Sequence, residues 1–178
     1  GESKDVRALM EIFEKSGIKV KALTVSHAFH SPQMDPMLEE FEKIAGEIKF
    51  SKPKIRLVSN LLGKRVDVEV TRPSYWREHV RQAVRFSDGI ASLQEEFKVF
   101  LEVGPGTTLC GMARLCVTAD SNHSFQPTLK KGKEAWASVT EAVAGLYVSG
   151  AKIDWKLWDS AYGQRQKVNL PHYAFQKS

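Results

Sequence analysis

Two histidines close together, His27 and His30, are the side chains of this sequence best suited to catalysis. They lie in the segment S-H-A-F-H-S (26–31), directly after a predicted strand over Lys19–Val25 that enters an apolar core. In α/β proteins, catalytic groups gather outside the carboxyl ends of strands. An imidazole titrates near neutral pH, so it can take a proton from a nucleophile and return it to a leaving group. The spacing alone leaves open a second interpretation, a structural histidine that caps the next turn, because no carboxylate lies close by.

A glycine-rich loop, G-P-G at residues 104–106, is a second candidate for chemistry. It follows the predicted strand Val99–Val103 and opens a predicted helix, and backbone amides at such a helix start can hold anions. The loop is not GxGxxG, however, and its proline removes one amide. A tight structural turn is therefore the favoured interpretation.

Other catalytic and metal-binding motifs are absent from the sequence. It contains no GxSxG nucleophile elbow, no Walker motif, no HExxH and no Cys/His cluster with metal-ligand spacing. Cys110 and Cys116 are too far apart for a CxxC pair and lie in an apolar stretch, which indicates buried thiols in a reducing cytosol. The residues alone thus predict a candidate catalytic histidine without its nucleophile.

Composition narrows the class of protein further. The 178 residues are 42% hydrophobic and 26% charged, which is enough apolar surface for one folded domain and argues against global disorder. No apolar run is long enough to span a membrane, and we expect no secretory signal, because the opening residues lack a charged segment followed by an apolar one. The net charge of +5 suits acidic partners, but the basic residues are dispersed among acidic ones, which is typical of solvated surface and not of a nucleic-acid site.

Hydrophobic periodicity predicts alternating helices and strands, hence an α/β fold with a mainly parallel sheet. Helices are expected from Ser3 to Gly17, from an Asp35-Pro36 start to Ile48, after the G-P-G loop, and over Glu134–Val148. The remaining expected segments are a strand over Ile55–Leu62, one or two helices within Tyr75–Phe97 broken near Ser87-Asp88, the strand Val99–Val103 and a loop over Thr118–Ser124.

The last stretch of the sequence is aromatic and interrupted by proline. It contains five aromatic residues, which are Trp155, Trp158, Tyr162, Tyr173 and Phe175. Disordered linkers are usually poor in aromatic residues, so we expect this tail to pack on another surface. Trp155 is expected to be mostly buried against this chain, and the end from Leu170 onward to be less fully covered.

Several motifs, in order along nearly the whole chain, carry a resemblance to one family. They are V-S-H-A-F-H-S-P-Q-M-D-P-M-L (25–38), S-N (59–60), Y-W-R-E-H-V-R (75–81), V-R-F (84–86), F-L-E-V-G-P-G (100–106), P-T-L (127–129), I-D-W (153–155) and L-P-H-Y-A-F (170–175). Together they resemble the C-terminal part of an acyltransferase domain of modular polyketide synthases, of the malonyl-specific type, with its post-acyltransferase linker.

The resemblance implies a fold and a division of the chain. The family has an α/β-hydrolase-like core with an inserted ferredoxin-like subdomain. Residues 1–21 would then be the end of that small subdomain, 22–117 the C-terminal half of the acyltransferase core, and 118–178 the linker that follows.

The resemblance also implies a reaction in two steps. In the family, a serine takes malonyl from malonyl-CoA, and the acyl-serine passes it to the phosphopantetheine thiol of an acyl carrier protein. His30 matches the catalytic histidine, acting as general base and then general acid, and His79 matches the position whose backbone carbonyl orients that ring. His27 and Phe29 match residues of substrate selectivity, since Phe29 would fill the space that the α-methyl of methylmalonyl needs. No permanently bound cofactor and no metal are expected.

The same resemblance implies partners for this chain, and two alternatives to it remain. The family's serine, carboxylate-binding arginine and oxyanion glutamine have no counterpart in this sequence, so the expected partners are the N-terminal half of the domain, the adjacent ketosynthase and the acyl carrier protein, with no nucleic acid and no membrane. The expected location is cytoplasmic. Two alternatives stay open: a non-catalytic acyltransferase remnant that serves as a docking or scaffold module, and an unrelated nucleotide-binding α/β domain.

Overall fold

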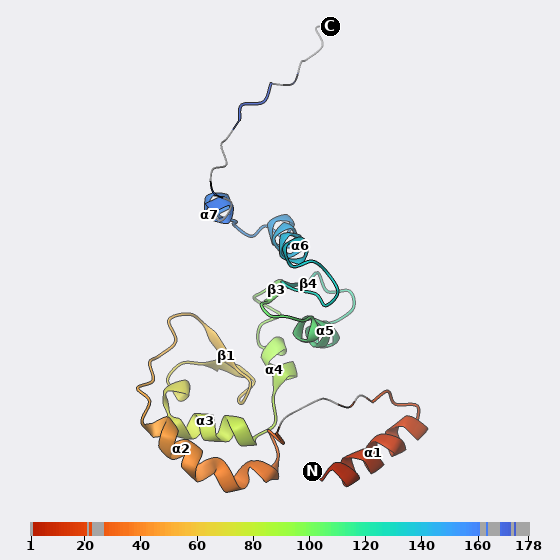
Figure 1. Ribbon diagram of the computed structural model, residues 1–178, viewed down its shortest axis with the longest axis vertical. Helices are drawn as coiled ribbons and strands as arrows, with labels where there is room; N and C mark the ends of the chain where they lie inside the picture. The colour runs from red at the N-terminus through yellow and green to blue at the C-terminus, as the bar shows by residue number, and fades with distance from the viewer. Residues whose placement is uncertain are drawn as a thin grey trace. The chain divides into compact units, whose positions relative to one another are not determined.

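The computed structural model describes residues 2–20, 22, 27–160, 163, 168–171 and 173, and these form two compact units. The first unit comprises Gly1–Lys98 and Gly111–His123, and the second comprises Val99–Cys110 and Ser124–Ser178. Figure 1 labels their helices and strands. The expected strand Lys19–Val25 falls largely outside the described residues, as do Tyr162 and Phe175 of the tail.

The first unit holds most of the short elements. In chain order they are the helix α1 (Ser3–Lys15), the 3-10 helix η1 (Pro32–Met37), α2 (Leu38–Gly46), the strands β1 (Leu57–Ser59) and β2 (Lys64–Val66), the 3-10 helix η2 (Glu69–Thr71), α3 (Pro73–Arg81) and α4 (Phe86–Ala91). The expected helix from Ser3 is confirmed, and Gly17 with φ 76° follows its end.

The start of the second helical segment differs from the prediction. Asp35 was expected to be its N-cap, but the cap is Ser31, whose hydroxyl accepts the Gln33 amide, with Pro32 in the first helical position. Asp35 lies inside η1, where it is free to contact another element. The apolar stripe continues into α2, which buries Leu38 and Ala45.

A hydrophobic cluster beside the β1–β2 hairpin anchors α3. Its buried members are Leu61, Val66, Val70 and Tyr75, with Leu62 and Trp76 packed against them. The two strands are antiparallel, with Leu57 opposite Val66, and β1 is shorter than the predicted Ile55–Leu62 because the chain turns at residues 60–63. Gly63 is required in that turn, since its φ is 64° and a Cβ there would lie 2.5 Å from the Asp88 Cβ.

Polar contacts fix the same region. The buried Ser59 hydroxyl lies 2.7 Å from the Tyr75 hydroxyl and accepts the amides of Leu61 and Leu62. The Trp76 indole donates to the Val70 carbonyl at 2.9 Å. Because these contacts hold the first turn of α3, they also determine where its last turn lies.

The helical stretch after Tyr75 is interrupted earlier than predicted. Gln82 has extended backbone angles (φ −80°, ψ 157°), so α3 ends at Arg81, and Ser87 and Asp88 lie within α4. Figure 1 shows α2 and α3 side by side, and the two helices are in contact.

The second unit is built on a pair of parallel strands. Its elements are β3 (Val99–Glu102), the first residues of α5 (Thr108–Leu115), β4 (Ser124–Pro127), α6 (Ala135–Val148) and α7 (Trp155–Ser160). β3 pairs in parallel with β4, and the stacked rings of Phe100 and Phe125 lie side by side on the ladder. The sequence predicted a loop up to Ser124, so β4 was missed.

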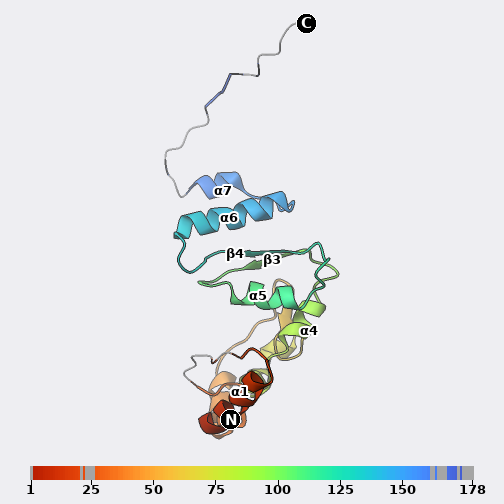
Figure 2. The same cartoon turned by 90° about the vertical axis from the view of Figure 1, so that its right-hand side faces the viewer.

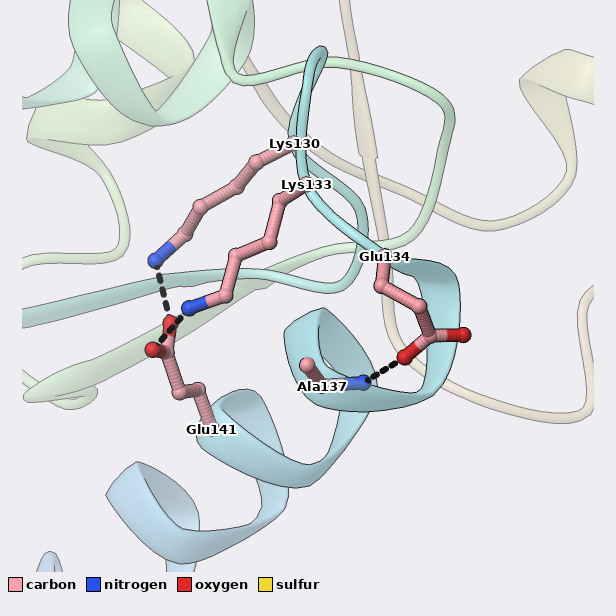
Figure 3. A network of polar contacts seen from close by, with 5 residues as sticks. All are labelled: Lys130, Lys133, Glu134, Ala137 and Glu141. Atoms are coloured by element: carbon pink, nitrogen blue, oxygen red, sulfur yellow. Dashed lines mark hydrogen bonds and ion pairs between the residues drawn. The ribbon is translucent and has the colours of Figure 1, made fainter.

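Helix α6 lies along this pair of strands, as Figure 2 shows, and packs on β4. It buries Ser138 and Ala142, and a Cβ at Gly145 would lie within 2.6 Å of the Gln126 side-chain amide. Its N-cap is Glu134, whose carboxylate accepts the amide of Trp136 and that of Ala137. Figure 3 shows the contact with Ala137.

The aromatic tail is helical at its start and more exposed than predicted. Trp158 packs edge-on against Trp136, and Trp155 packs edge-on against Tyr147. Trp155 is nevertheless 47% exposed, so the expectation that it is mostly buried is wrong. Its partner Tyr147 is itself 58% exposed and cannot shield the whole ring from solvent. Leu170 and Tyr173 are both 77% exposed, in agreement with the prediction for the far end.

Strand order also differs from the mainly parallel sheet that periodicity predicted. Within the described residues the strands form one antiparallel pair and one parallel pair. The mixture of helices and strands itself agrees with the prediction. In the part of the chain that the structure describes, no helix combines the length and apolar character needed to cross a membrane.

Candidate functional site

His30 has an unusual backbone conformation. Its φ is 64°, and no other non-glycine residue described in the structure has a positive φ. Such a conformation costs about 1–3 kcal/mol and persists only where the surroundings enforce it. A hydrogen bond within the turn that contains His30 stabilises it: the Ser31 hydroxyl donates to the Ala28 carbonyl at 2.7 Å.

The C-terminal end of α3 supplies the rest of the support. The last carbonyls of a helix lack partners within the helix. The His30 amide donates to the Val80 carbonyl at 2.9 Å, and its ring Nδ1 lies 2.7 Å from the Gln82 carbonyl. The backbone amide and the ring of His30 thus each contact one carbonyl oxygen at the end of α3.

The carbonyl beside the ring differs from the one predicted. We expected His79, whereas the structure has Gln82 at this position, three residues further along the chain. The reason is the extended conformation of Gln82, which turns its carbonyl away from the helix axis and toward the ring.

This contact fixes the protonation pattern of the ring. A carbonyl oxygen only accepts hydrogen bonds, so Nδ1 must carry the proton. In the neutral imidazole, Nε2 then has the lone pair and can accept a proton from another group. The side chain is exposed, so Nε2 can meet a nucleophile that approaches from outside.

His79 lies close to the site as a side chain. Its ring centroid is 6.2 Å from that of His30, and it also contacts the rings of Tyr75 and Trp76. Burial lowers the pKa of His79 below its ordinary value of 6.5, and the charge of His30 lowers it further. His79 therefore favours the neutral form beside the His30 ring.

The two predicted selectivity residues flank His30 on the same turn. His27 and Phe29 are exposed, with Phe29 at 52%. The Phe29 ring is 5.7 Å from His27 and 6.5 Å from His30, centroid to centroid. The structure thus brings together all four residues that the sequence singled out.

Ion pairs link the segment after His30 to α3. Arg81, the last residue of α3, pairs with Asp35 of η1, and Arg77 pairs with Glu42 of α2 at 3.4 Å. Asp35, Arg77 and Arg81 line a groove of about 690 Å³ whose wall also includes Gln82. Sequence reasoning missed Gln82, Arg81 and the pairing of Asp35, because only the fold brings positions so distant in the chain into contact.

The G-P-G loop has no free anion site at the following helix. The Glu102 carboxylate accepts the amides of Leu109 (3.2 Å) and Cys110 (2.8 Å) in the first turn of α5. The Thr128 hydroxyl donates to the Glu102 carbonyl and accepts the Gly104 amide. These contacts support the structural-turn interpretation. Among the described residues, no group of three or more His, Cys, Asp or Glu side chains is placed to hold a metal ion.

Comparison with known proteins identifies the family. The family model for the acyl transferase domain matches residues 1–152. The chain is 38% identical, over 99% of its length, to polyketide synthase GfsA of Streptomyces halstedii and to mycoketide-CoA synthase of Mycobacterium tuberculosis. It spans only 2% and 4% of those two proteins.

Solved structures agree with this comparison. The acyltransferase domain from the second module of the salinomycin polyketide synthase matches with a TM-score of 0.83 and 38% identity, covering 98% of this chain and 41% of that one. The acyl transferase domain of ZmaA matches with a TM-score of 0.81 and 26% identity, covering 96% of this chain and 40% of that one. The chain therefore belongs to the acyltransferase-domain family of polyketide synthases.

Proposed function

We propose that this chain is the histidine-bearing part of an acyltransferase that moves a malonyl-type extender unit from CoA to an acyl carrier protein through an acyl-serine. The relatives are polyketide synthases far longer than this chain, so a ketosynthase and a carrier protein are the proposed neighbours. Malonyl-CoA is the proposed substrate, and the phosphopantetheine arm belongs to the carrier protein.

The contact between His30 Nδ1 and the Gln82 carbonyl, at 2.7 Å, is the observation that carries this proposal. It supports Nε2 as the base that takes the serine proton during acylation. When the phosphopantetheine thiol attacks the acyl-serine, the imidazolium returns that proton to the serine oxygen as it leaves. The ring needs no carboxylate partner for this, because a fixed carbonyl suffices to orient it.

Serine, arginine and glutamine for this reaction are proposed to come from the N-terminal half of the domain. The sequence of this chain contains no GxSxG. We propose that residues 1–21 complete a ferredoxin-like subdomain, that 22–117 complete an α/β-hydrolase-like core, and that 118–178 form the following linker. Val103 and Leu115, at 81% and 87% exposed, are apolar side chains that such a partner segment would cover.

Selectivity for malonyl is proposed to depend on the side chains before His30. Phe29 is bulky, lies beside the His30 ring and is half exposed, so it can limit the space next to the acyl group. A single methyl group changes binding by about 1–3 kcal/mol in such pockets, so the preference is expected to be strong without being absolute.

Acylation of the serine in the complete domain tests the proposal. His30→Ala should slow acylation by malonyl-CoA about 10²–10⁴-fold, the usual contribution of a general base. His27→Ala should keep most of that rate and change the ratio of malonyl to methylmalonyl transfer. As a control, the 178-residue chain alone should transfer no malonyl. Equal and severe losses in both variants, or transfer by the chain alone, would overturn the assignment.

A further inference from the structure

The ion pair between Asp35 and Arg81 joins the two segments whose relative position sets the orientation of His30. Asp35 lies in η1, which follows the His30 turn directly, and the Arg81 Nε donates to its carboxylate. Arg81 ends α3 and stands between Val80 and Gln82. Those two flanking residues supply the carbonyls that His30 contacts.

Stability alone does not account for this pair well. Exposed ion pairs contribute little to folding, and the Asp35 side chain is 53% exposed. A change in the position of Arg81, in contrast, moves both acceptors of His30 together, because they are its immediate neighbours in the chain. The left-handed backbone of His30 makes the site sensitive to such a change, since that conformation depends on external support.

A second ion pair along the same two segments provides a comparison. Arg77 pairs with Glu42 one helical turn earlier, so it also links α3 to the segment after His30. Its neighbours in the chain, Trp76 and Glu78, supply no acceptor to His30. Both pairs therefore join α3 to the segment after His30, through Asp35 of η1 in one and Glu42 of α2 in the other, and they differ in their relation to the ring.

We propose that Asp35 and Arg81 are positioning residues for the proposed general base, holding the Val80 and Gln82 carbonyls where the His30 amide and Nδ1 meet them. This inference rests on the proposed function of His30. Neither residue touches the reacting atoms in this proposal: they act only through the orientation of the imidazole.

The test compares Asp35→Asn with Glu42→Gln in the complete acyltransferase domain. Asp35→Asn should reduce the rate of serine acylation about tenfold, within the roughly 10²-fold that a misplacement of about 1 Å can cost. Glu42→Gln should stay within about twofold, because surface changes of this kind seldom have large effects. Asp35→Glu, which restores the carboxylate, should recover part of the loss.

A spectroscopic measurement separates this effect from a loss of fold. In the complete acyltransferase domain labelled with 15N-histidine, long-range 1H–15N spectra at alkaline pH should show His30 protonated at Nδ1. Asp35→Asn should increase the share protonated at Nε2, and Glu42→Gln should not. Equal effects of the two variants, or none from Asp35→Asn, overturn the positioning role.

Failure of the positioning role is distinguishable from failure of the proposed function. If His30→Ala leaves acylation intact, His30 is not the base, whatever Asp35 does. If His30→Ala abolishes acylation while Asp35→Asn matches the wild type in both rate and tautomer, only the positioning role is wrong. If Asp35→Asn does not fold, Asp35→Glu and Arg81→Gln replace it in the test. The proposal is supported if His30 keeps the wild-type tautomer in Asp35→Glu and changes it in Arg81→Gln. Any other pattern rejects the proposal.

Discussion

Two short segments of this chain contact helices through different kinds of group, main-chain carbonyls in one and charged side chains in the other. The His30 turn is fastened to the end of α3 by the main-chain carbonyls of Val80 and Gln82. The loop before α6 is fastened by Lys130 and Lys133, which both donate to the Glu141 carboxylate, as Figure 3 shows.

The two kinds of contact respond differently to pH and salt. Carbonyls do not titrate, and they accept Nδ1–H from the neutral and from the protonated ring alike. The Glu141 contact depends on charge: hydrogen bonds from Lys130 and Lys133 lower the pKa of this carboxyl from 4.5 to about 2. The ring of the proposed general base is thus held by carbonyls, whose charge does not change with pH, whereas the surface loop is held by an ionic contact that acid and salt can weaken.

The largest expected effect comes from the buried contacts beneath α3. Ser59 is 2% exposed, and its hydroxyl meets Tyr75 and two amides. Ser59→Ala leaves these groups unpaired, so we expect a loss of about 2–4 kcal/mol in the free energy of unfolding by urea. Ser92→Ala, which removes an exposed hydroxyl bound to the Gly89 carbonyl, should cost less than about 0.5 kcal/mol. Similar losses in both would mean that the Ser59 contacts do not anchor α3.

A smaller effect is expected in the pH dependence of stability near His30. The folded pKa of His79 is depressed by burial and by the charge of His30, so the unfolded state binds more protons as pH falls below 6.5. Stability is therefore lost between pH 6.5 and the lower folded pKa. Urea midpoints from pH 8 to pH 5 should show this loss, and His79→Gln should flatten the profile. A His79→Gln profile equal to that of the wild type would contradict this contribution of His79.

The smallest effect is expected at the ionic contact of the second region. The depressed pKa of Glu141 gives stability that is present above its ordinary value of 4.5 and lost as pH falls toward about 2. Glu141→Gln should remove that part of the acid dependence and reduce the sensitivity of the thermal midpoint to salt. Glu95→Gln, at another exposed carboxylate, should change neither. An unchanged acid profile in Glu141→Gln would show that the lysine contacts do not hold the loop.

The local pattern of the sequence predicted the helices well and the contacts between them poorly. Helices α1 and α6 follow directly from apolar spacing and their end residues. Strand β4 was missed because Ser124-Phe125-Gln126-Pro127 has little apolar character and is recognisable only by its pairing with β3. The aromatic content of the tail indicated packing, but could not show that Trp155 stays 47% exposed although its ring contacts Tyr147.

The site was likewise predictable in part. The two histidines and Phe29 stand out by type and spacing, and they do lie together. The carbonyl that meets the His30 ring could not be read from the sequence, since any residue supplies one. Its selection depends on the extended backbone at Gln82 and the left-handed backbone at His30, and both are consequences of tertiary contacts.

The tautomer of His30 tests the central claim most directly. In the complete wild-type domain labelled with 15N-histidine, at a pH where the His30 ring is neutral, the account predicts a proton on Nδ1, bonded to the Gln82 carbonyl, and an unprotonated Nε2. A His30 ring protonated mainly at Nε2 would contradict the account, because the nitrogen assigned as the base would not be available.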